Sequence, residues 1–450
     1  MRLSRIEVSK LFGVFDHVIP LNLSDRITII HGPNGYGKTA VLLMVQSVLG
    51  NRFAKLRRVP FEKLVLSLED GRELSVTKEF PSKTEAEREE QSATLVFRLK
   101  MQGRDPEEFK LPFSPLREGL RIPLELIERH IEDLERVGHD TWVHVHTGRK
   151  LQLEDIIELY GEFLPIGPQQ KRKVPAWLTQ LPNEFDVRLI EAQRLLSFAD
   201  SPRARRAESF RFEPAVSSYS KELAAKIQEV QAQYGTFSQQ LDSSFPMRAI
   251  QFKPPVSIDA AEVTEKLQKL EGNRQRIIAA GLLAPQAQTA AIFGPQQTQT
   301  VEEPIKGILA LLAQDIEKKL SVFDEITAKV ELFKELVNKR FSYKQLDVRG
   351  ETGFRFQTSS GSQLLPTDLS SGEQHELVLL YELLFKTKRN ALILIDEPEL
   401  SLHVAWQVQF LKDLARVIKL SSFDVLLATH SPQIIDTRWD LTVELKGPDA

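Results

Sequence analysis

The sequence predicts an α/β protein with mixed sheets and a helical insertion. Apolar, β-branched runs alternate with helical spacing near both ends of the 450-residue chain, at 26–50 and at 392–445. Between them, residues 218–340 repeat apolar side chains every three or four positions, in segments separated by proline- and glutamine-rich loops. A chain of this length exceeds the usual single core, so we expect one large domain with insertions or a few packed lobes.

Composition excludes several classes of protein. Apolar residues make up 42% and charged residues 27%, which is typical of a globular domain. The chain has no cysteine, so it has no disulfide framework and no thiolate metal site. Its first residues lack the apolar core of a signal peptide, and no apolar run approaches the roughly 20 residues of a membrane span. A net charge of −3 argues against a uniformly basic surface, and we expect a cytoplasmic protein.

The amino-terminal elements follow from short-range patterns. We expect strands at 2–8 and 26–30, a helix at 39–49 that Gly50 ends, and a hairpin over 62–78 that turns at Asp70-Gly71. An insertion follows, with a helix at 124–137, and residues 186–196 are expected to pass from a strand into a helix.

The remaining elements complete the predicted organisation. We expect helices at 218–241, 259–283 and 304–340, the last a single helix of about 50 Å with one apolar seam. The final block alternates strands (341–347, 354–358, 392–395, 423–427, 442–445) with a helix at 373–386. The predicted parts are 1–80 and 341–450 as two lobes of one head, 81–197 as an insertion that returns to the first lobe, and 198–340 as a helical arm.

The segment GPNGYGKT fits the phosphate-loop pattern G-x-x-x-x-G-K-[ST], and it lies between a predicted strand and a predicted helix. Backbone N–H groups around Asn34, Gly35 and Gly37 and the helix amino terminus are expected to hold phosphate. Lys38 would reach the β and γ oxygens, and the Thr39 hydroxyl would reach Mg²⁺. With this flanking structure, a glycine turn without a ligand is the weaker interpretation.

Polar residues end two later apolar strands. Asp396 and Glu397 follow the run 392–395, where Asp396 is expected to hold the metal and its water shell and Glu397 to orient or deprotonate the attacking water. His430 ends the next strand and is expected to donate a hydrogen bond to the γ-phosphate. Each feature alone fits a structural role, but the nearby phosphate loop favours the catalytic interpretation.

A second glycine-centred turn lies in LSSGEQ, where Ser370, Ser371, Gly372 and Glu373 open a helix. Its hydroxyl and N–H groups form a second expected anion site. Only the first site has a lysine and a metal ligand. We therefore expect two chains head to tail, with each nucleotide between the phosphate loop of one and the serine turn of the other.

Together, GPNGYGKT, LSSGEQ, LILIDEPE and ATHS resemble the Walker A, signature, Walker B and switch-histidine motifs of ATP-binding-cassette (ABC) ATPases. The resemblance covers about 1–50 and 369–445, and DEPELSLH is similar to the branch with SMC-like repair ATPases and the overcoming-lysogenisation-defect (OLD) family. It implies an ABC-type ATPase head that uses ATP and Mg²⁺ and forms ATP-sandwich dimers. By the same resemblance, residues 399–403 would be the D-loop between the two chains, and Gln193 would be the glutamine-loop ligand of Mg²⁺.

Two further assignments stay open at this point. Phe12 or Phe15 is expected to pack on adenine, although either fits the core equally well. The segment HDTWVHVH contains His139, Asp140, His144 and His146. These side chains could bind metal, but a solvated strand edge is the favoured interpretation because the neighbouring residues do not complete a ligand set.

The resemblance also implies partners. OLD-family proteins carry a Toprim nuclease domain after the ATPase, and only 20 residues follow His430 here, so we expect the nuclease on a separate protein. The chain resembles the stand-alone OLD-like ATPases of anti-phage systems of the PARIS and Septu types. This implies a sensor or scaffold that restrains an effector nuclease until a phage trigger protein arrives.

The alternative function is a DNA-repair ATPase that clamps duplex DNA. Three basic clusters support it, although such clusters are more often solvated faces. They are Arg52, Lys55, Arg57 and Arg58; Lys171, Arg172 and Lys173; and Arg203, Arg205 and Arg206. A transporter ATPase is disfavoured, since the insertion is too large for a coupling lobe.

Overall fold

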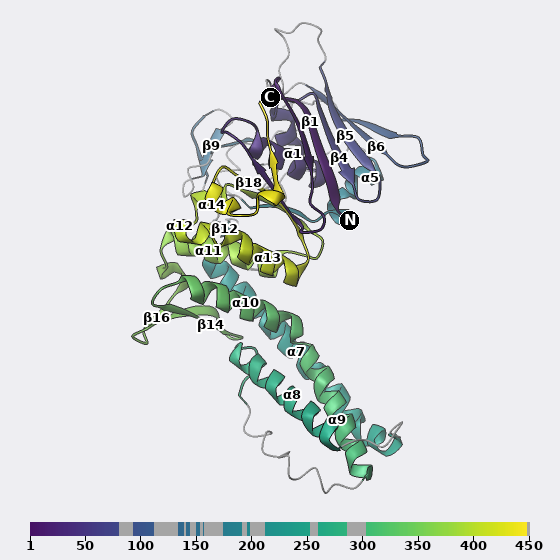
Figure 1. The fold of residues 1–450 in the computed structure, drawn as a ribbon, viewed down its shortest axis with the longest axis vertical. Coiled ribbons are helices and arrows are strands. Elements are labelled where there is room, and N and C mark those ends of the chain that lie inside the picture. Colours follow the sequence, from purple (N-terminus) through teal and green to yellow (C-terminus); the bar gives the residue numbers. More distant parts are fainter. Residues whose placement is uncertain are drawn as a thin grey trace. The chain divides into compact units, whose positions relative to one another are not determined.

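The computed structural model describes residues 1–80, 93–111, 134–138, 141–144, 150–153, 156, 174–190, 196–198, 212–252, 260–285 and 303–447. It forms two compact units, one of residues 1–215 with 386–450 and the other of residues 216–385. Mixed sheets and a helical insertion confirm the predicted α/β class (Figure 1). The four-part division by residue range stays a prediction. Within the described residues, no helix is both long and apolar enough to cross a membrane.

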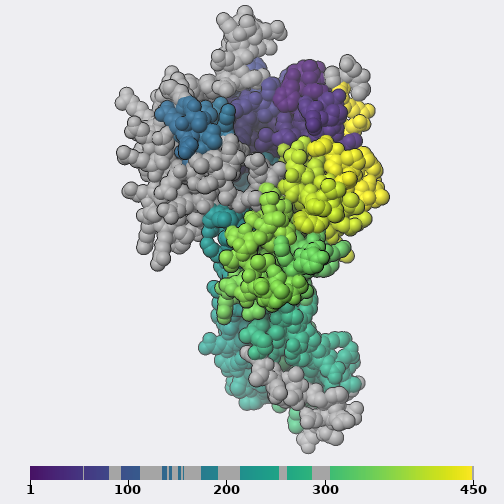
Figure 2. All heavy atoms as spheres, turned by 90° about the vertical axis from the view of Figure 1, so that its left-hand side faces the viewer, coloured from purple at the N-terminus to yellow at the C-terminus, as the bar shows by residue number. Residues whose placement is uncertain are grey.

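A five-stranded parallel sheet forms the centre of the first unit. Its order is β11 (Val187–Ile190), β17 (Leu392–Asp396), β18 (Asp424–Thr429), β3 (Ile27–His31) and β19 (Thr442–Glu444). All neighbouring strands pair in parallel, so their carboxyl ends share one edge. Every residue of β18 is buried, as expected of a strand covered on both faces. In Figure 2 the two ends of the chain, purple and yellow, lie side by side in this unit.

The first unit also contains a six-stranded antiparallel sheet. Its order is β2 (Phe15–Pro20), β1 (Leu3–Leu11), β4 (Lys63–Leu68), β5 (Glu73–Glu79), β6 (Thr94–Lys100) and β7 (Glu107–Leu111). The hairpin predicted at Asp70-Gly71 is confirmed, with Gly71 at a φ of 85° and its N–H donating to the Leu68 carbonyl. Helix α1 (Lys38–Leu49) belongs to the same apolar core as strands of both sheets. The helix ends at Gly50, as predicted.

A small strand replaces the end of the helix predicted at 124–137, whose residues 124–133 lie outside the described residues. In the range 124–137, residues Leu134–Arg136 form β8, which pairs with β9 (Thr141–His144) and then β10 (Lys150–Gln152). The strand predicted at the start of 186–196 is confirmed as β11, whereas residues 191–195, where a helix was predicted, lie outside the described residues. Leu196–Phe198 is β12, paired with β13 (Phe212–Pro214). Pairing with β9 overrides local helical propensity at 134–136. This unit also contains the short helices α2 (Phe53–Arg58), α5 (Ala176–Thr179) and α6 (Leu181–Glu184).

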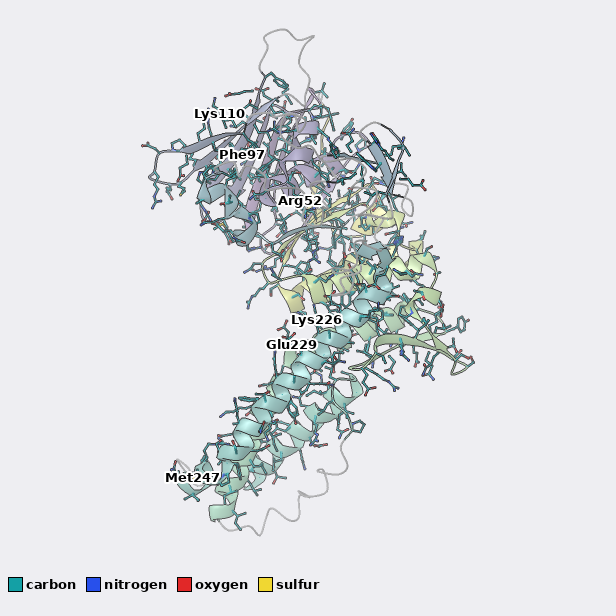
Figure 3. All side chains as sticks on the ribbon, turned by 180° about the vertical axis from the view of Figure 1, so that it is seen from behind. Arg52, Phe97, Lys110, Lys226, Glu229 and Met247 are labelled. Carbon is teal, nitrogen blue, oxygen red and sulfur yellow. The ribbon has the colours of Figure 1, made fainter. Side chains whose placement is uncertain are left out.

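Long helices make up most of the second unit. They are α7 (Ala215–Gln251), α8 (Ala260–Ala279), α9 (Glu303–Ser321) and α10 (Asp324–Arg340). Figure 3 shows α7 from Lys226 to Met247, so the helix extends beyond the predicted end at 241. After α10 come β14 (Lys344–Arg349), β15 (Gly353–Thr358) and β16 (Gln363–Leu364), a 3-10 turn at Pro366–Asp368, and α11 (Ser371–Tyr381), which continues as a π-helical turn over Glu382–Lys386.

The predicted single helix at 304–340 is wrong, because the chain breaks between α9 and α10. The break lies at Val322 and Phe323, where the Phe323 N–H bonds the Leu320 carbonyl. The Phe323 ring is fully buried against Tyr234 of α7, with ring centroids 5.2 Å apart. Asp324 and Glu325 then begin a new helix, and acidic residues are favoured in a first turn.

Candidate nucleotide site

The phosphate loop lies between β3 and α1, as its sequence predicts. Gly37 precedes the helix with a φ of 88°, in the left-handed region. A Cβ atom at this position would lie 2.3 Å from Leu11 Cδ2, so both backbone conformation and space require glycine here. The loop therefore leads directly to the amino terminus of a buried helix, a local geometry suited to an anion.

The Lys38 side chain turns back over this loop. Its ammonium donates to the carbonyls of Gly32 at 2.8 Å and Pro33 at 3.1 Å, and the residue is only 5% exposed. A phosphate in the loop would meet this ammonium and the first N–H groups of α1 together.

Thr39 and Asp396 meet although they are 357 positions apart. The Thr39 hydroxyl lies 2.9 and 3.1 Å from the two carboxylate oxygens of Asp396, which ends β17. A hydroxyl and a carboxylate are hard oxygen ligands, which suit Mg²⁺ completed by phosphate and water. Among the described residues, no group of three or more His, Cys, Asp or Glu side chains could hold a metal by itself. A metal here would therefore depend on these two oxygen donors and the nucleotide.

Glu397 follows at the same edge in an unusual backbone conformation. Its φ of 42° and ψ of 60° lie in the left-handed region, which costs a non-glycine residue of order 1–3 kcal/mol. Its N–H donates to the Ala428 carbonyl at 2.9 Å, so the neighbouring strand helps to hold this conformation. The carboxylate lies 3.6 Å from His430 Nδ1. The two predicted catalytic side chains are thus brought together.

Glu399 is a residue of the site that sequence reasoning placed only in the D-loop. One of its carboxylate oxygens accepts the Thr429 hydroxyl at 2.7 Å and the His430 N–H at 3.0 Å, and lies 3.0 Å from His430 Nδ1. An acid two positions after Glu397 was visible in the sequence. Its direction, toward the histidine of the same chain, was not.

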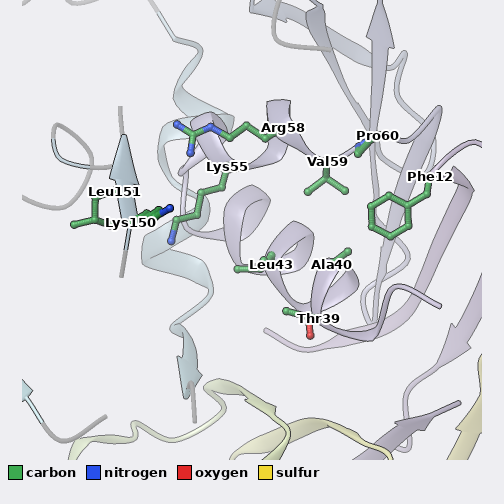
Figure 4. A pocket seen from close by; sticks show the side chains of 10 residues that line it. All are labelled: Phe12, Thr39, Ala40, Leu43, Lys55, Arg58, Val59, Pro60, Lys150 and Leu151. Carbon is green, nitrogen blue, oxygen red and sulfur yellow. The ribbon is translucent and has the colours of Figure 1, made fainter. Parts of the chain in front are cut away.

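A cavity of about 480 Å³ opens beside Thr39 (Figure 4). Such a volume is typical of small-molecule sites. Its lining combines apolar side chains of α1 and of the loop after α2 with Phe12 and with the cations Lys55, Arg58 and Lys150. Phe12 is 45% exposed. Phe15 instead packs against Tyr36 and His17, with ring centroids 5.1 and 5.8 Å away. Of the two phenylalanines, therefore, Phe12 faces the cavity.

The basic cluster at 52–58 does not form one continuous face. Arg57 donates to the carbonyls of Ala93 and Leu111, which is a structural role at the edge of the antiparallel sheet. Lys55 and Arg58 line the cavity, whereas Arg52 is exposed (Figure 3). The clusters at 171–173 and 203–206 lie outside the described residues.

The serine turn lies in the second unit, at the start of α11. Ser370 and Glu373 form a capping box, in which the N–H and hydroxyl of Ser370 donate to one Glu373 oxygen at 2.9 and 2.8 Å. Lys344 Nζ binds both Glu373 oxygens at 2.8 and 2.7 Å. Burial raises the pKa of Glu373, but the hydrogen bonds from Lys344 and Ser370 outweigh it and the pKa is lowered. The donors of Ser370 are therefore engaged within the turn, whereas Ser371 is exposed and a Cβ atom at Gly372 would meet open space.

Several predicted residues cannot be placed. Gln193, His139, Asp140 and His146 lie outside the described residues. His144 ends β9, and its side chain is likewise not among those described. Their predicted roles stay predictions.

The chain is similar in sequence to one protein family and to one nuclease. A family model described as "AAA domain, putative AbiEii toxin, Type IV TA system" matches residues 27–436. An OLD nuclease of Thermus scotoductus is 30% identical over 122 residues, which are 27% of this chain. The matched part spans only 22% of that relative.

Solved structures similar to this chain include SMC head domains. One is from Pyrococcus furiosus and has an extended coiled coil bound to the C-terminal domain of ScpA. It is 12% identical to this chain, with a TM-score of 0.35, and the match covers 99% of this chain and 94% of that chain. Another is from Thermotoga maritima, 12% identical, with a TM-score of 0.31, over 97% of this chain and 91% of that chain. Identity and scores are low, so the likeness assigns neither fold nor function.

Proposed function

This chain belongs to the family described as "AAA domain, putative AbiEii toxin, Type IV TA system", and we propose that it binds ATP with Mg²⁺ and slowly hydrolyses it to ADP and phosphate. One observation carries the proposal. The Thr39–Asp396 hydrogen bond joins the phosphate-loop helix to a strand end that also carries Glu397, beside His430. A glycine turn with a purely structural role would not require this convergence.

Each residue of the site has a separate role. Backbone N–H groups of the loop and Lys38 bind the phosphates, while Thr39 and Asp396 hold Mg²⁺. Bound Mg²⁺ offsets negative charge on the phosphate oxygens. Glu397 accepts a proton from the attacking water. The base of the nucleotide enters the cavity beside Thr39 and packs on Phe12.

We further propose that the site is completed by a second copy of the chain. The first unit has the lysine and the metal ligands, whereas Ser371 and Gly372 offer N–H groups at a helix amino terminus and no metal ligand. Leu400, within the D-loop segment, and Val404, directly after it, are 65% and 56% exposed. Such apolar residues beside a polar site suit burial against a partner copy. A head-to-tail dimer would use both features.

In the cell, we propose that this ATPase is a sensor or scaffold that controls a separate effector in anti-phage defence. The family description names a toxin and a TA system, and one relative is an OLD nuclease. The effector would be a Toprim-type nuclease, and a phage protein would be the trigger. The DNA-clamp alternative is weakened because Arg57 of the first basic cluster has carbonyl partners within the chain.

Glu397→Gln tests the ATPase proposal. We expect ATP binding to be retained, turnover to fall about 100-fold or more, and copies to stay associated in ATP, because the variant cannot take the proton of the water. Turnover, nucleotide binding and molecular mass by light scattering measure these three effects. Glu444→Gln is the matched control, since Glu444 is an exposed carboxylate that ends a strand of the same sheet. Unchanged turnover in Glu397→Gln would remove Glu397 from its role.

The partner proposal has its own experiment. The chain is expressed with and without its neighbouring gene, and assembly mass and ATP turnover are compared. Co-purification as a large complex with slow turnover supports the sensor. A chain that dimerises only with ATP, and whose turnover rises on duplex DNA, supports the DNA clamp instead.

A further inference from the structure

The carboxylate of Glu399, beside the site, is buried, whereas that of Glu397 is partly exposed. Glu399 lies on a 3-10 turn at Pro398–Leu400, and its side chain is 6% exposed, compared with 26% for Glu397. Burying a carboxylate is unfavourable unless hydrogen bonds or charges compensate for the lost water. The partners of Glu399 therefore indicate what it does.

Those partners are concentrated on one oxygen. Glu399 Oε1 receives the Thr429 hydroxyl at 2.7 Å and the His430 N–H at 3.0 Å, and His430 Nδ1 lies 3.0 Å from it. The other oxygen, Oε2, is buried and makes no hydrogen bond with any described residue. Both hydrogen bonds to Glu399 thus come from residues 429–430, the segment that carries the ring of His430.

We propose that Glu399 is a positioning residue, which holds His430 through Nδ1–H and thereby leaves Nε2 as the ring atom that meets the γ-phosphate. An ionised carboxylate has no proton to donate, so the ring nitrogen held 3.0 Å from it is the one that we expect to carry a proton. Donation from Nε2 to phosphate then requires a second proton on the ring. The carboxylates of Glu399 and Glu397 lie 3.0 and 3.6 Å from Nδ1.

The same bonds join His430 to the D-loop segment 399–403. Gln407 Nε2 donates to the carbonyls of Glu399 at 3.3 Å and Leu402 at 3.2 Å, and Gln407 Oε1 accepts the Ser431 hydroxyl at 3.2 Å. The segment 429–431, which carries His430, is thus tied to the backbone that carries exposed Leu400. The positioning role rests on the proposed function only for its effect on hydrolysis, since the contact between Glu399 and the His430 ring needs no nucleotide.

The first test reads the ring directly, without ATP. Histidine labelled with ¹⁵N reports which nitrogen carries the proton, and His430→Gln assigns the signal among the nine histidines. At alkaline pH we expect Nδ1–H for His430 in the wild type. In Glu399→Ala we expect the ring to change to the Nε2–H form that free imidazole side chains favour. Asp440→Asn is the control, an exposed carboxylate ten positions after His430.

The second test is a double-mutant cycle on ATP turnover. Glu399→Gln keeps an acceptor oxygen for the loop but removes the negative charge, so it should fold even where Glu399→Ala does not. We expect kcat to fall about 10- to 100-fold with nucleotide affinity unchanged. In a His430→Ala background, the same change should have no further effect, because Glu399 acts through the ring.

Each outcome decides one proposal. A wild-type ring protonated on Nε2 alone, or Glu399→Gln acting equally in both backgrounds, overturns the positioning role. A protein without ATP turnover whose Nδ1–H form disappears in Glu399→Ala refutes the proposed ATPase but supports the positioning of His430. Turnover in wild type with coupled effects of the two residues supports both.

Discussion

Two turns of this molecule present a helix amino terminus, yet they are equipped differently. The phosphate loop adds the Lys38 ammonium and the Thr39–Asp396 oxygen pair. The turn before α11 adds a carboxylate, Glu373, already neutralised by Lys344. An anion at the second turn therefore meets N–H groups beside an acid, which makes the turn weak as an independent site. This difference supports a nucleotide that is bound first by one copy and then contacted by the other.

The two turns also differ in what holds them in shape. The side chain of Leu11 in β1 fills the space that a Cβ atom at Gly37 would need. The Thr39 hydroxyl bonds Asp396, which is 357 positions away. Ser370 and Glu373 close their capping box within four residues. The first turn depends on tertiary structure and the second largely on its own sequence. Substitutions at the two places should therefore separate binding from association.

Lys38→Ala tests the first turn and should have the largest effect. Among the described residues, Lys38 is the only side-chain cation bonded across the loop. Without its ammonium, ATP affinity should fall at least about 100-fold, and turnover should fall with it. Calorimetry on the isolated chain measures the affinity. Lys412→Ala, an exposed lysine paired with Asp436, is the control. ATP bound by Lys38→Ala with wild-type affinity would contradict the phosphate-loop assignment.

Ser371→Arg tests the second turn and should spare binding. A bulky cation at the start of α11 blocks the close approach of a second copy, so dimers in ATP should be lost and turnover should fall about tenfold or more. Light scattering and calorimetry distinguish the two effects. Ser360→Arg, in the exposed turn after β15, is the control. Loss of ATP binding to the isolated Ser371→Arg chain would contradict a site shared between copies.

Sequence reasoning succeeded where the signal is local. Gly50 ends α1, Asp70-Gly71 forms the hairpin, and Asp396 lies at the end of a buried strand, each as predicted. It failed where distant contacts decide. The break at Phe323 contains neither glycine nor proline and depends on Tyr234. Residues Leu134–Arg136 are a strand because β9 pairs with them.

The candidate site shows the same division. That Thr39 and Asp396 meet follows from strands whose carboxyl ends share an edge. Which phenylalanine faces the cavity depends on how β1 and β2 turn, and the sequence left Phe12 and Phe15 equal. The inward direction of Glu399 depends on a short 3-10 turn, for which no sequence rule gives an orientation.

Phe12→Ala and Phe15→Ala compare the two phenylalanines of the first unit, and each should have a moderate effect on either the KM for ATP or the Tm. Removal of Phe12 should raise the KM for ATP about tenfold while kcat and thermal stability hold, because an exposed ring is lost from the cavity. Removal of Phe15 should lower the Tm and leave KM nearly unchanged, since its ring packs on Tyr36 and His17. The opposite pattern would exchange the two assignments.

Lys344→Ala should have the smallest effect, and its pH dependence tests how the second turn is held. The bonds from Lys344 and Ser370 lower the pKa of Glu373 below its ordinary value of 4.5, so their stabilisation is complete above that pH and is lost as the pH falls through the folded-state pKa. Urea unfolding at neutral pH should show a loss of about 1 kcal/mol or less, because the pair is partly open to solvent. The difference between wild type and variant should shrink as the pH is lowered past 4.5. Lys269→Ala, which breaks an exposed pair with Glu265, should change stability less. A difference that grows on acidification would mean that Lys344 stabilises the turn by packing rather than by charge.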